Sequence, residues 1–254
     1  MLLEKKKCLI FGVANTRSIA YGIAEAFTKH GASIAMNYFG DALKKRVEPI
    51  AEELSADFIF PCNVANEQEL QDAVTLVKEQ WGSVDTIVHS VAFANKDELA
   101  GRFLDTSKEG FATALEISAF SLPNIIRHFE PLLSQDASVI TLSYYGAEKY
   151  IPHYNVMGVA KSALESSVRY LAVDLGHKQI RVNAISAGPI KTLAASGISD
   201  FSHILRLVEE KAPLKRNVTQ EEVGDVAVFL ASPLSRAITG EVIHVDCGYN
   251  IVGI

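Results

Sequence analysis

The stretch from Tyr144 to Lys161 holds the residues best suited to chemistry. Tyr144 and Tyr154 are followed by Lys161, seven residues after the second tyrosine. A tyrosine hydroxyl can donate a proton or a hydrogen bond to an oxyanion, and a fixed ammonium nearby makes that donation easier. If a helix begins near Pro152, Tyr154 and Lys161 lie roughly 10 Å apart along its axis, on nearly the same face. Both side chains could then converge on one small molecule. The alternative is that Tyr154 packs on a strand and Lys161 extends to water.

An alternation of strands and helices surrounds this stretch. Apolar runs predict seven strands, at residues 7–12, 32–37, 57–62, 84–89, 138–143, 180–186 and 242–246. Helical periodicity or composition marks residues 18–27, 42–54, 67–81, 109–133, 157–175, 203–211 and 219–230. Strands that are apolar on both faces predict an α/β fold, a Rossmann-type doubly wound parallel sheet covered by helices on both faces. Residues 1–254 show no repeat or linker, so we expect one domain, with the ligand site at the carboxyl edge of the sheet.

The first strand-to-helix turn could bind a diphosphate. Ser18 is a good N-cap, and its hydroxyl and the free amides at the positive end of the helix could hold phosphate oxygens. Only Gly12 and Gly22 match the glycines of a dinucleotide fingerprint, and Ala14 stands where a second turn glycine is usual. An ordinary turn therefore remains an equal alternative.

Composition excludes several classes of function. The chain has 254 residues, 48% hydrophobic and 21% charged, which is enough for a large core. A net charge of -6, spread along the chain, argues against a nucleic-acid binder and against an anionic-membrane surface. No signal sequence or membrane span is visible, and three distant cysteines predict buried reduced thiols, so we expect a cytoplasmic protein. The seven histidines lack metal-ligand spacing, and we expect no metal site.

Six segments, spread over almost the whole chain, carry a resemblance to a known family. They are Gly12-Val13-Ala14 with Ser18-Ile19-Ala20-x-Gly22, Val88-His89-Ser90, Leu142-Ser143-Tyr144-x-Gly146-Ala147-Glu148, Tyr154-Asn155-Val156-Met157-Gly158-x-Ala160-Lys161, Arg181 to Pro189, and Val245-Asp246-x-Gly248. Together they resemble the bacterial NADH-dependent enoyl-[acyl-carrier-protein] reductases of the short-chain dehydrogenase/reductase superfamily. Most members of that superfamily place a tyrosine four residues before the lysine, where this chain has Met157. The spacing Tyr-x6-Lys, preceded by Tyr144, is the arrangement of the enoyl reductases.

The resemblance implies reduction of the trans-2 double bond of an enoyl thioester, the last step of the elongation cycle of type II fatty acid synthesis. Hydride from the nicotinamide would add to C3 of the substrate, and Tyr154 would stabilise the negative charge on the thioester oxygen. Lys161 would hold the nicotinamide ribose, and Tyr144 would shape the acyl pocket or support the proton path.

The same match assigns the remaining site residues. The cofactor-binding set would be Gly12, Ala14, Ser18 and Ile19 at the diphosphate, Asn63 and Val64 at the adenine, Ser90 and Ala92 at the central ribose, and Lys161, Ile190 and Thr192 at the nicotinamide end. The acyl chain would meet Phe93, Tyr144, Tyr154, Met157 and Phe201, although core packing also explains Met157. A substrate-binding lid would lie around residues 191–211, with its mobile part at 193–201.

Three departures from the family pattern affect ligands. Asn63 replaces an acid that accepts a hydrogen bond from adenine, and Ala92 replaces a glycine, which predicts weaker binding of flat inhibitors that stack on the nicotinamide. Phe39 replaces a polar residue at the end of the second strand. NADH is the expected cofactor, and NADPH stays possible.

Partners also follow from the resemblance. It implies an acyl carrier protein as the substrate carrier and a homotetramer, and the apolar tail at 251–254 suggests a subunit contact. Four basic residues could dock the acidic carrier: Arg206, Lys211, Lys215 and Arg216. The alternative is that they simply form an exposed helix face. Two other functions stay open: a related oxidoreductase with a different substrate, and a non-catalytic dinucleotide-binding protein.

Overall fold

The computed structural model describes residues 1–193, 195 and 200–253 of the chain. Within them, seven strands form one sheet in the order β3-β2-β1-β4-β5-β6-β7, and every neighbouring pair is parallel. The strands are β1 Lys7–Phe11, β2 Ser33–Tyr38, β3 Phe58–Pro61, β4 Val84–His89, β5 Leu133–Ser143, β6 Arg181–Ala187 and β7 Val242–Val245. The predicted doubly wound parallel sheet is therefore confirmed.

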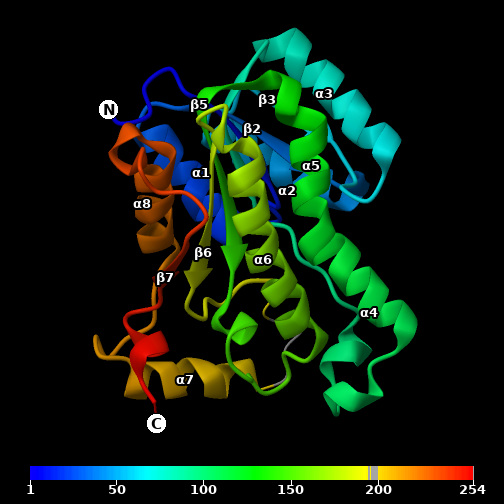
Figure 1. The fold of residues 1–254 in the computed structure, drawn as a ribbon, viewed down its shortest axis with the longest axis vertical. Coiled ribbons are helices and arrows are strands. Elements are labelled where there is room, and N and C mark those ends of the chain that lie inside the picture. Colours follow the sequence, from blue (N-terminus) through cyan, green and yellow to red (C-terminus); the bar gives the residue numbers. More distant parts are fainter. Residues whose placement is uncertain (194, 196–199, 254) are drawn as a thin grey trace.

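Helices cover both faces of the sheet (Figure 1). One face carries α1 Ile19–Lys29, α2 Gly40–Glu53 and α8 Gln220–Ala231, and the other carries α3 Glu67–Trp81, α5 Ser121–Phe129 and α6 Val156–Gly176. Each face has its own apolar core, and on the α3, α5 and α6 face Phe11 packs edge-to-face against Phe60 and Phe129. Two buried layers around one sheet leave the carboxyl ends of the strands as the open edge.

The order of the strands reverses between β1 and β4, which places a crevice at their carboxyl ends. Gly12 follows β1 with φ +104°, and a Cβ there would overlap the carbonyl of Ser90, which follows β4. Only glycine fits, because both the backbone angle and the contact forbid a side chain.

The helix predicted over 109–133 is not one regular helix. The chain forms α4 Lys108–Leu115, a π-helical turn Glu116–Phe120, α5, and a 3-10 turn Glu130–Leu132 before β5 begins at Leu133. The π turn carries Ser118, whose hydroxyl accepts a hydrogen bond from the Phe93 amide (2.9 Å) and donates one to the Phe93 carbonyl (3.0 Å). The irregular turn therefore anchors the loop that follows β4.

The last helix before α8 lies outside the two layers. α7 Phe201–Lys211 crosses beyond the carboxyl ends of β5 and β6, close to the C-terminal segment (Figure 1). Residues 194 and 196–199 of the predicted lid, and Ile254 of the predicted tail, lie outside the described residues. No helix in the described part of the chain has the length and apolar content to cross a membrane.

The three cysteines are free. Cys8 and Cys62 are buried as predicted, but Cys247 is only half-buried because it lies in the turn after β7, with φ 59°. The prediction of three buried thiols was therefore wrong for Cys247.

Candidate active site

Tyr144 and Tyr154 meet at the carboxyl edge of the sheet. Tyr144 follows the last residue of β5, and its ring lies 5.0 Å from that of Tyr154 at an interplanar angle of 73°. A Cβ at Gly146 would overlap the Tyr154 ring, and one at Gly158 would lie 2.8 Å from the Gly146 carbonyl oxygen. Two glycines therefore make the space into which Tyr154 fits, and they bring both predicted tyrosines together.

Tyr154 reaches this position from a turn and not from a helix. α6 begins at Val156, so the expectation of a helix beginning near Pro152 was wrong. His153 and Asn155 have φ values of 61° and 37°, which are incompatible with a continuing right-handed helix. The Asn155 amide extends toward the carbonyl of Gly101 (3.3 Å), in the loop after β4.

Lys161 lies on α6 and points into the protein. Its side chain is buried, and Nζ donates a hydrogen bond to the carbonyl of Leu142 in β5 at 2.7 Å. The alternative that Lys161 extends to water is therefore wrong. Burial lowers the pKa of Lys161 to about 8, and the nearby Glu165 partly opposes that shift. Lys161 is mostly charged at neutral pH, and its hydrogen bond to Leu142 holds Nζ at a residue two positions before Tyr144 in the chain.

Burial has the opposite effect on the tyrosines. It raises the pKa of Tyr154 far above its ordinary range, and Tyr144 and Glu165 add to the shift. Burial also raises the pKa of Tyr144, with a smaller contribution from Tyr249. Both hydroxyls are protonated at neutral pH, so both can donate hydrogen bonds to an oxyanion.

The turn after β1 is organised by Ser18. Its hydroxyl accepts hydrogen bonds from the amides of Ala14 and Asn15, each at 3.0 Å, and donates to the Asn15 carbonyl at 2.8 Å. Ser18 is the N-cap residue of α1, but its side chain does not cap the helix. The Ser18 hydroxyl is thus engaged inside the loop, while the first amides of α1, from Ile19 on, still point out of the helix end.

Asn37 is a residue of this edge that the sequence patterns did not single out. Its side-chain oxygen accepts from the Gly12 amide at 3.0 Å, and its side-chain nitrogen donates to the Cys62 carbonyl at 3.1 Å. Asn37 is buried, and its two hydrogen bonds link the ends of β1, β2 and β3. A polar residue within an otherwise apolar strand was the available signal.

The predicted adenine residues follow β3. Val64 is buried, and the side-chain oxygen of Asn63 accepts from the Ala65 amide at 3.1 Å. The oxygen that was expected to meet adenine therefore already closes an Asx turn, with one lone pair left.

The predicted acyl residues fall into two groups. Met157 is buried with Leu99 and Tyr154, and its sulfur lies 3.6 Å from the Ser118 hydroxyl. Core packing of Met157 is thus observed. Phe93 is exposed outside this cluster, and Ala92 beside it is also exposed.

Phe201 belongs to the second group, at the start of α7. It packs on a cluster of Ile204, Val208 and Ala212, which also contacts Ile151. Ile151 contacts the Tyr154 cluster as well, so α7 and the tyrosine turn share one neighbour.

The nicotinamide end has few described contacts. Ile190 packs against the α1, α2 and α8 core, and the Thr192 hydroxyl accepts from the Ala195 amide at 3.1 Å. Among the described residues, no three His, Cys, Asp or Glu side chains are grouped so that they could hold a metal ion.

Known proteins share this fold and sequence. The model of the family described as enoyl-(acyl carrier protein) reductase matches residues 12–250. The enoyl-[acyl-carrier-protein] reductase [NADH] 1 of Rhizobium meliloti is 56% identical over 252 residues, which cover 99% of this chain and 93% of that protein. The corresponding NADH enzyme of Aquifex aeolicus is 50% identical, covering 100% of this chain and 94% of that protein.

Solved structures agree. An enoyl-(acyl-carrier-protein) reductase from Anaplasma phagocytophilum in complex with NAD has a TM-score of 0.96 at 52% identity, covering 100% of this chain and 97% of that one. The Bacillus cereus reductase with NADP+ and indole naphthyridinone has a TM-score of 0.98 at 49% identity, covering 100% and 99%. The motifs, the fold and the relatives lead to one conclusion: the chain belongs to the enoyl-(acyl carrier protein) reductase family.

Proposed function

We propose that this protein reduces the trans-2 double bond of enoyl-acyl-carrier-protein thioesters with NADH, in the last step of the fatty-acid elongation cycle. The observation that carries the proposal is the Tyr144–Tyr154 pair at the sheet edge, beside the buried Lys161 on the next helix. The family and the NADH named for its relatives support the reaction and the cofactor.

The residues at the carboxyl edge fit a dinucleotide. Gly12 lets the ends of β1 and β4 approach closely at the switch point, because a Cβ there would overlap the Ser90 carbonyl, and the amides at the start of α1 point to where a diphosphate would lie. The diphosphate would be held by Gly12, Ala14, Ser18 and Ile19, the adenine by Asn63 and Val64, the ribose by Ser90, Ala92 and Lys161, and the nicotinamide by Ile190 and Thr192. The bound cofactor supplies the hydride that adds to C3 of the enoyl group.

The chain's own residues then stabilise the charge. As negative charge develops on the thioester oxygen, the protonated Tyr154 hydroxyl donates a hydrogen bond to it. A preorganised donor of this kind contributes about 3 kcal/mol to transition-state stabilisation. The Lys161 ammonium adds positive potential in a site from which burial excludes water, and the Tyr144 ring fixes the Tyr154 ring by edge-to-face contact.

The substrate side is formed by residues after β4 and by α7. Phe93, which is exposed, would meet the acyl chain together with Phe201, and Met157 would form the inner wall through its contact with Ser118. Residues 191–211 would act as a lid within the same single domain, because α7 rests on a small cluster of its own.

An acidic carrier protein would dock near α7. Arg216 already pairs with Glu222 (Nη1 to Oε2, 2.8 Å), and the Lys215 Nζ donates to the Glu210 carbonyl at 2.8 Å. Arg206 and Lys211 on α7 are therefore the better docking candidates among the four basic residues of the sequence analysis.

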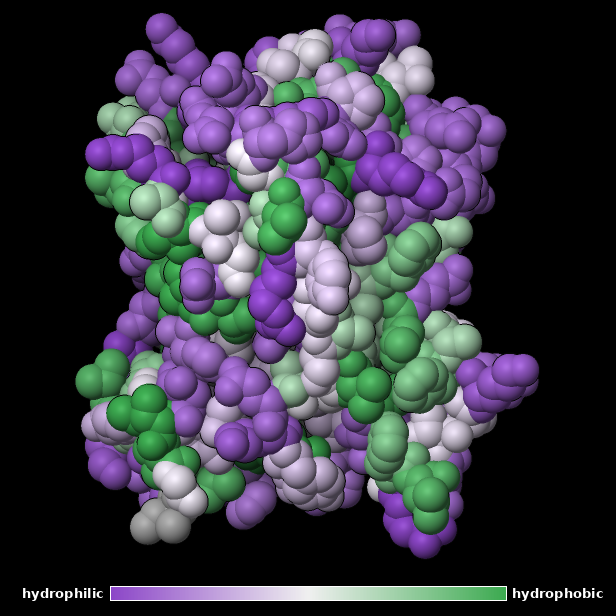
Figure 2. Space-filling view, in the orientation of Figure 1, coloured by the Kyte–Doolittle hydropathy of each residue, from purple (hydrophilic) through white to green (hydrophobic). Residues whose placement is uncertain are grey.

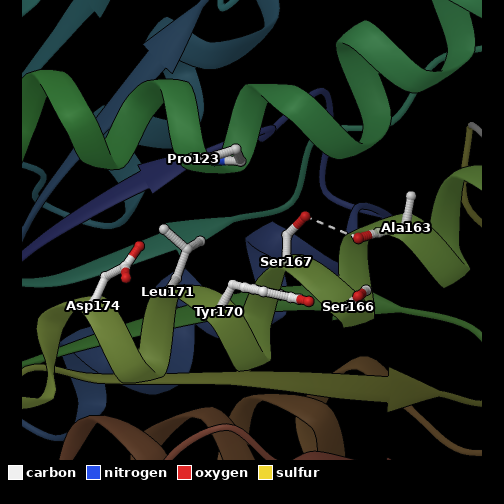
Figure 3. Close-up of a pocket in the computed structure, with 7 residues that line it drawn as sticks. All are labelled: Pro123, Ala163, Ser166, Ser167, Tyr170, Leu171 and Asp174. Atoms are coloured by element: carbon white, nitrogen blue, oxygen red, sulfur yellow. Dashed lines mark hydrogen bonds between the residues drawn. The ribbon is translucent and has the colours of Figure 1, made fainter.

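The face of α5 and α6 would be a subunit contact in a homotetramer. A depression of about 490 Å³ lies between these helices, with Pro123 facing Leu171 and Tyr170 (Figure 3). Tyr170 and Val173 are 73% and 80% exposed, and pale and green side chains run over this side of the molecule in Figure 2. At the C-terminal segment, Ile251 is 75% exposed and would join a second contact.

The reduced thiols Cys8 and Cys62 support our placement of the protein in the cytoplasm.

The test is the loss of reduced-nicotinamide absorbance when protein meets a trans-2-enoyl thioester, with NADH and NADPH in separate reactions. We expect turnover with NADH and a loss of at least 100-fold in Tyr154→Phe and Lys161→Ala. The matched control Tyr145→Phe should change turnover little, because the Tyr145 hydroxyl donates to the Asn250 carbonyl at 3.2 Å, near the C-terminus. Dinucleotide binding without turnover over a range of acyl lengths would favour another carbonyl substrate or a non-catalytic role.

A further inference from the structure

Leu142 and Ser143 at the end of β5, and Tyr144 directly after it, each contact a different residue of the α6 region. The Leu142 carbonyl accepts from Lys161 at 2.7 Å, the Ser143 hydroxyl donates to Glu165 Oε1 at 2.5 Å, and the Tyr144 ring packs on Tyr154. Lys161 and Glu165 lie one turn apart on α6 and are only 6% and 8% exposed. Glu165 is therefore part of the same constellation, although no motif of the sequence points to it.

A buried carboxylate needs a reason, because its burial is unfavourable unless other groups compensate the charge. Burial raises the pKa of Glu165, and the hydrogen bond from Ser143 lowers it. More distant groups act in both directions: Glu148, after the 3-10 turn at 145–147, raises it, whereas His244 of β7 and Arg169 of α6 lower it. His244 itself lies 2.7 Å from Glu148, so these two side chains partly compensate each other at the surface end.

Lys161 is the cation that lies one turn before this carboxylate on α6. The described residues show no ion pair between Lys161 and Glu165, and Nζ donates to the Leu142 carbonyl instead. The Glu165 charge nevertheless raises the pKa of Lys161 through space. Charges interact strongly at short range when both are shielded from water. The other charged or titratable groups that face this pair are Tyr154, which the Glu165 charge also affects, and His89 of β4, which the Lys161 charge affects.

We propose that Glu165 is a positioning residue of the active site: its carboxylate keeps the buried Lys161 in the ammonium form, and the hydrogen bond from Ser143 fixes that carboxylate to the strand that carries Tyr144. The electrostatic part concerns the chain alone, and only its catalytic consequence rests on the proposed function.

The proposal predicts how Lys161 titrates. Burial lowers the pKa of Lys161 to about 8, and Glu165 is the group that raises it again. Without the carboxylate, Lys161 loses its proton at a lower pH, so fewer molecules carry the ammonium at neutral pH. A merely structural Glu165, which only packs α6 on β5, would not change this titration.

The experiment compares the parent protein with Glu165→Gln, which keeps the shape and an acceptor for Ser143 but removes the charge. Lysine side chains are labelled with 13C at Cε and titrated by NMR without any cofactor, and the Lys161 signal is assigned by its loss in Lys161→Arg. We expect the midpoint to fall by about one pH unit in Glu165→Gln. The matched control Glu148→Gln, an exposed acid at the same end of the sheet, should leave the midpoint within a few tenths of a unit.

Activity provides the second readout. The alkaline limb of the pH profile of kcat/KM should move to lower pH in Glu165→Gln by the same shift as the NMR midpoint. If the parent protein does not reduce enoyl thioesters, the proposed function fails while the NMR titration still decides the role of Glu165. An unchanged Lys161 midpoint in a folded Glu165→Gln protein would overturn the proposal.

A folding defect would also be informative. Should Glu165→Gln not fold, the double variant Lys161→Met/Glu165→Gln decides the matter, because it removes the ammonium that has lost its counter-charge. Recovery of folding in the double variant supports the proposal. Failure of the double variant, while Lys161→Met alone folds, would assign Glu165 to packing and refute the electrostatic role.

Discussion

A buried histidine makes the stability of this protein depend on pH below neutrality. His89 ends β4 with no exposed surface, and its ring nitrogens lie 2.8 Å from the Thr141 and Ser121 hydroxyls. Burial, followed by the nearby Lys161 charge, lowers the pKa of His89 to about 3 from 6.5. The folded chain keeps this ring neutral where the unfolded chain protonates it. Stability from His89 is therefore complete above pH 6.5 and is lost as the pH falls toward 3.

The magnitude follows from the gap between the two pKa values. pH 5 lies about 1.5 units below the pKa of His89 in the unfolded chain, so the unfolded chain binds a proton that the folded chain does not. This binding lowers the free energy of unfolding by about 2 kcal/mol relative to neutral pH. That is a large share of the 5 to 15 kcal/mol or so that stabilises an ordinary domain. Urea unfolding at pH 7.5 and pH 5.0 measures it.

The matched variant is His89→Gln, which loses the same packing at both pH values but cannot gain the proton. Its free energy of unfolding should fall by about 2 kcal/mol less than that of the parent between pH 7.5 and 5.0. The exposed His177→Gln serves as the control and should follow the parent. If the parent and His89→Gln lose equal stability over this interval, the argument from burial is refuted.

Three further predictions follow from the site. Gly146→Ala should lower turnover by at least 10-fold, because its methyl group overlaps the Tyr154 ring. The control Gly176→Ala, where a Cβ meets no atom, should leave turnover unchanged. Equal effects of the two substitutions would contradict the packing argument. Lys161→Met should abolish turnover. The parent should gain stability as the pH rises from about 8 toward 10.5, because the unfolded chain keeps the Lys161 proton that the folded chain loses, and Lys161→Met should lack this gain; an equal gain in both proteins during urea unfolding would contradict this. Ala92→Gly should bind flat nicotinamide-stacking inhibitors more tightly in calorimetry, and unchanged binding would remove Ala92 as a determinant.

The sheet and most helices could be predicted because their signals are local. β4 was predicted at its observed bounds from its apolar run, and α3 was predicted at its observed bounds, where the structure shows a capping residue at each end. The Asn66 side chain accepts from the amides of Gln68 and Glu69 at the first turn, and Gly82 ends the helix with φ 73°.

The start of α6 could not be predicted in the same way. Pro152 suits the first turn of a helix, and nothing local indicates that His153 and Asn155 adopt positive φ values instead. In the same turn the Tyr154 ring packs so closely on Gly146 that a Cβ there would overlap it, a contact that no local sequence signal shows. The residues of the site were thus named from motifs, while the turn that delivers Tyr154 was found only in the structure.

Burial of Lys161 was likewise invisible to sequence patterns, and it explains why the site needs more than the tyrosine-lysine motif. Burial keeps the hydroxyl of Tyr154 protonated and keeps His89 neutral, so that no second cation stands beside Lys161. The same burial would also discharge Lys161, because it penalises every charged form alike. A site that needs both a protonated tyrosine and a charged lysine must therefore offset the effect of burial on the lysine, but not on the tyrosine. The carboxylate of Glu165, one helical turn away and held by Ser143, is the group that raises the pKa of Lys161 against burial.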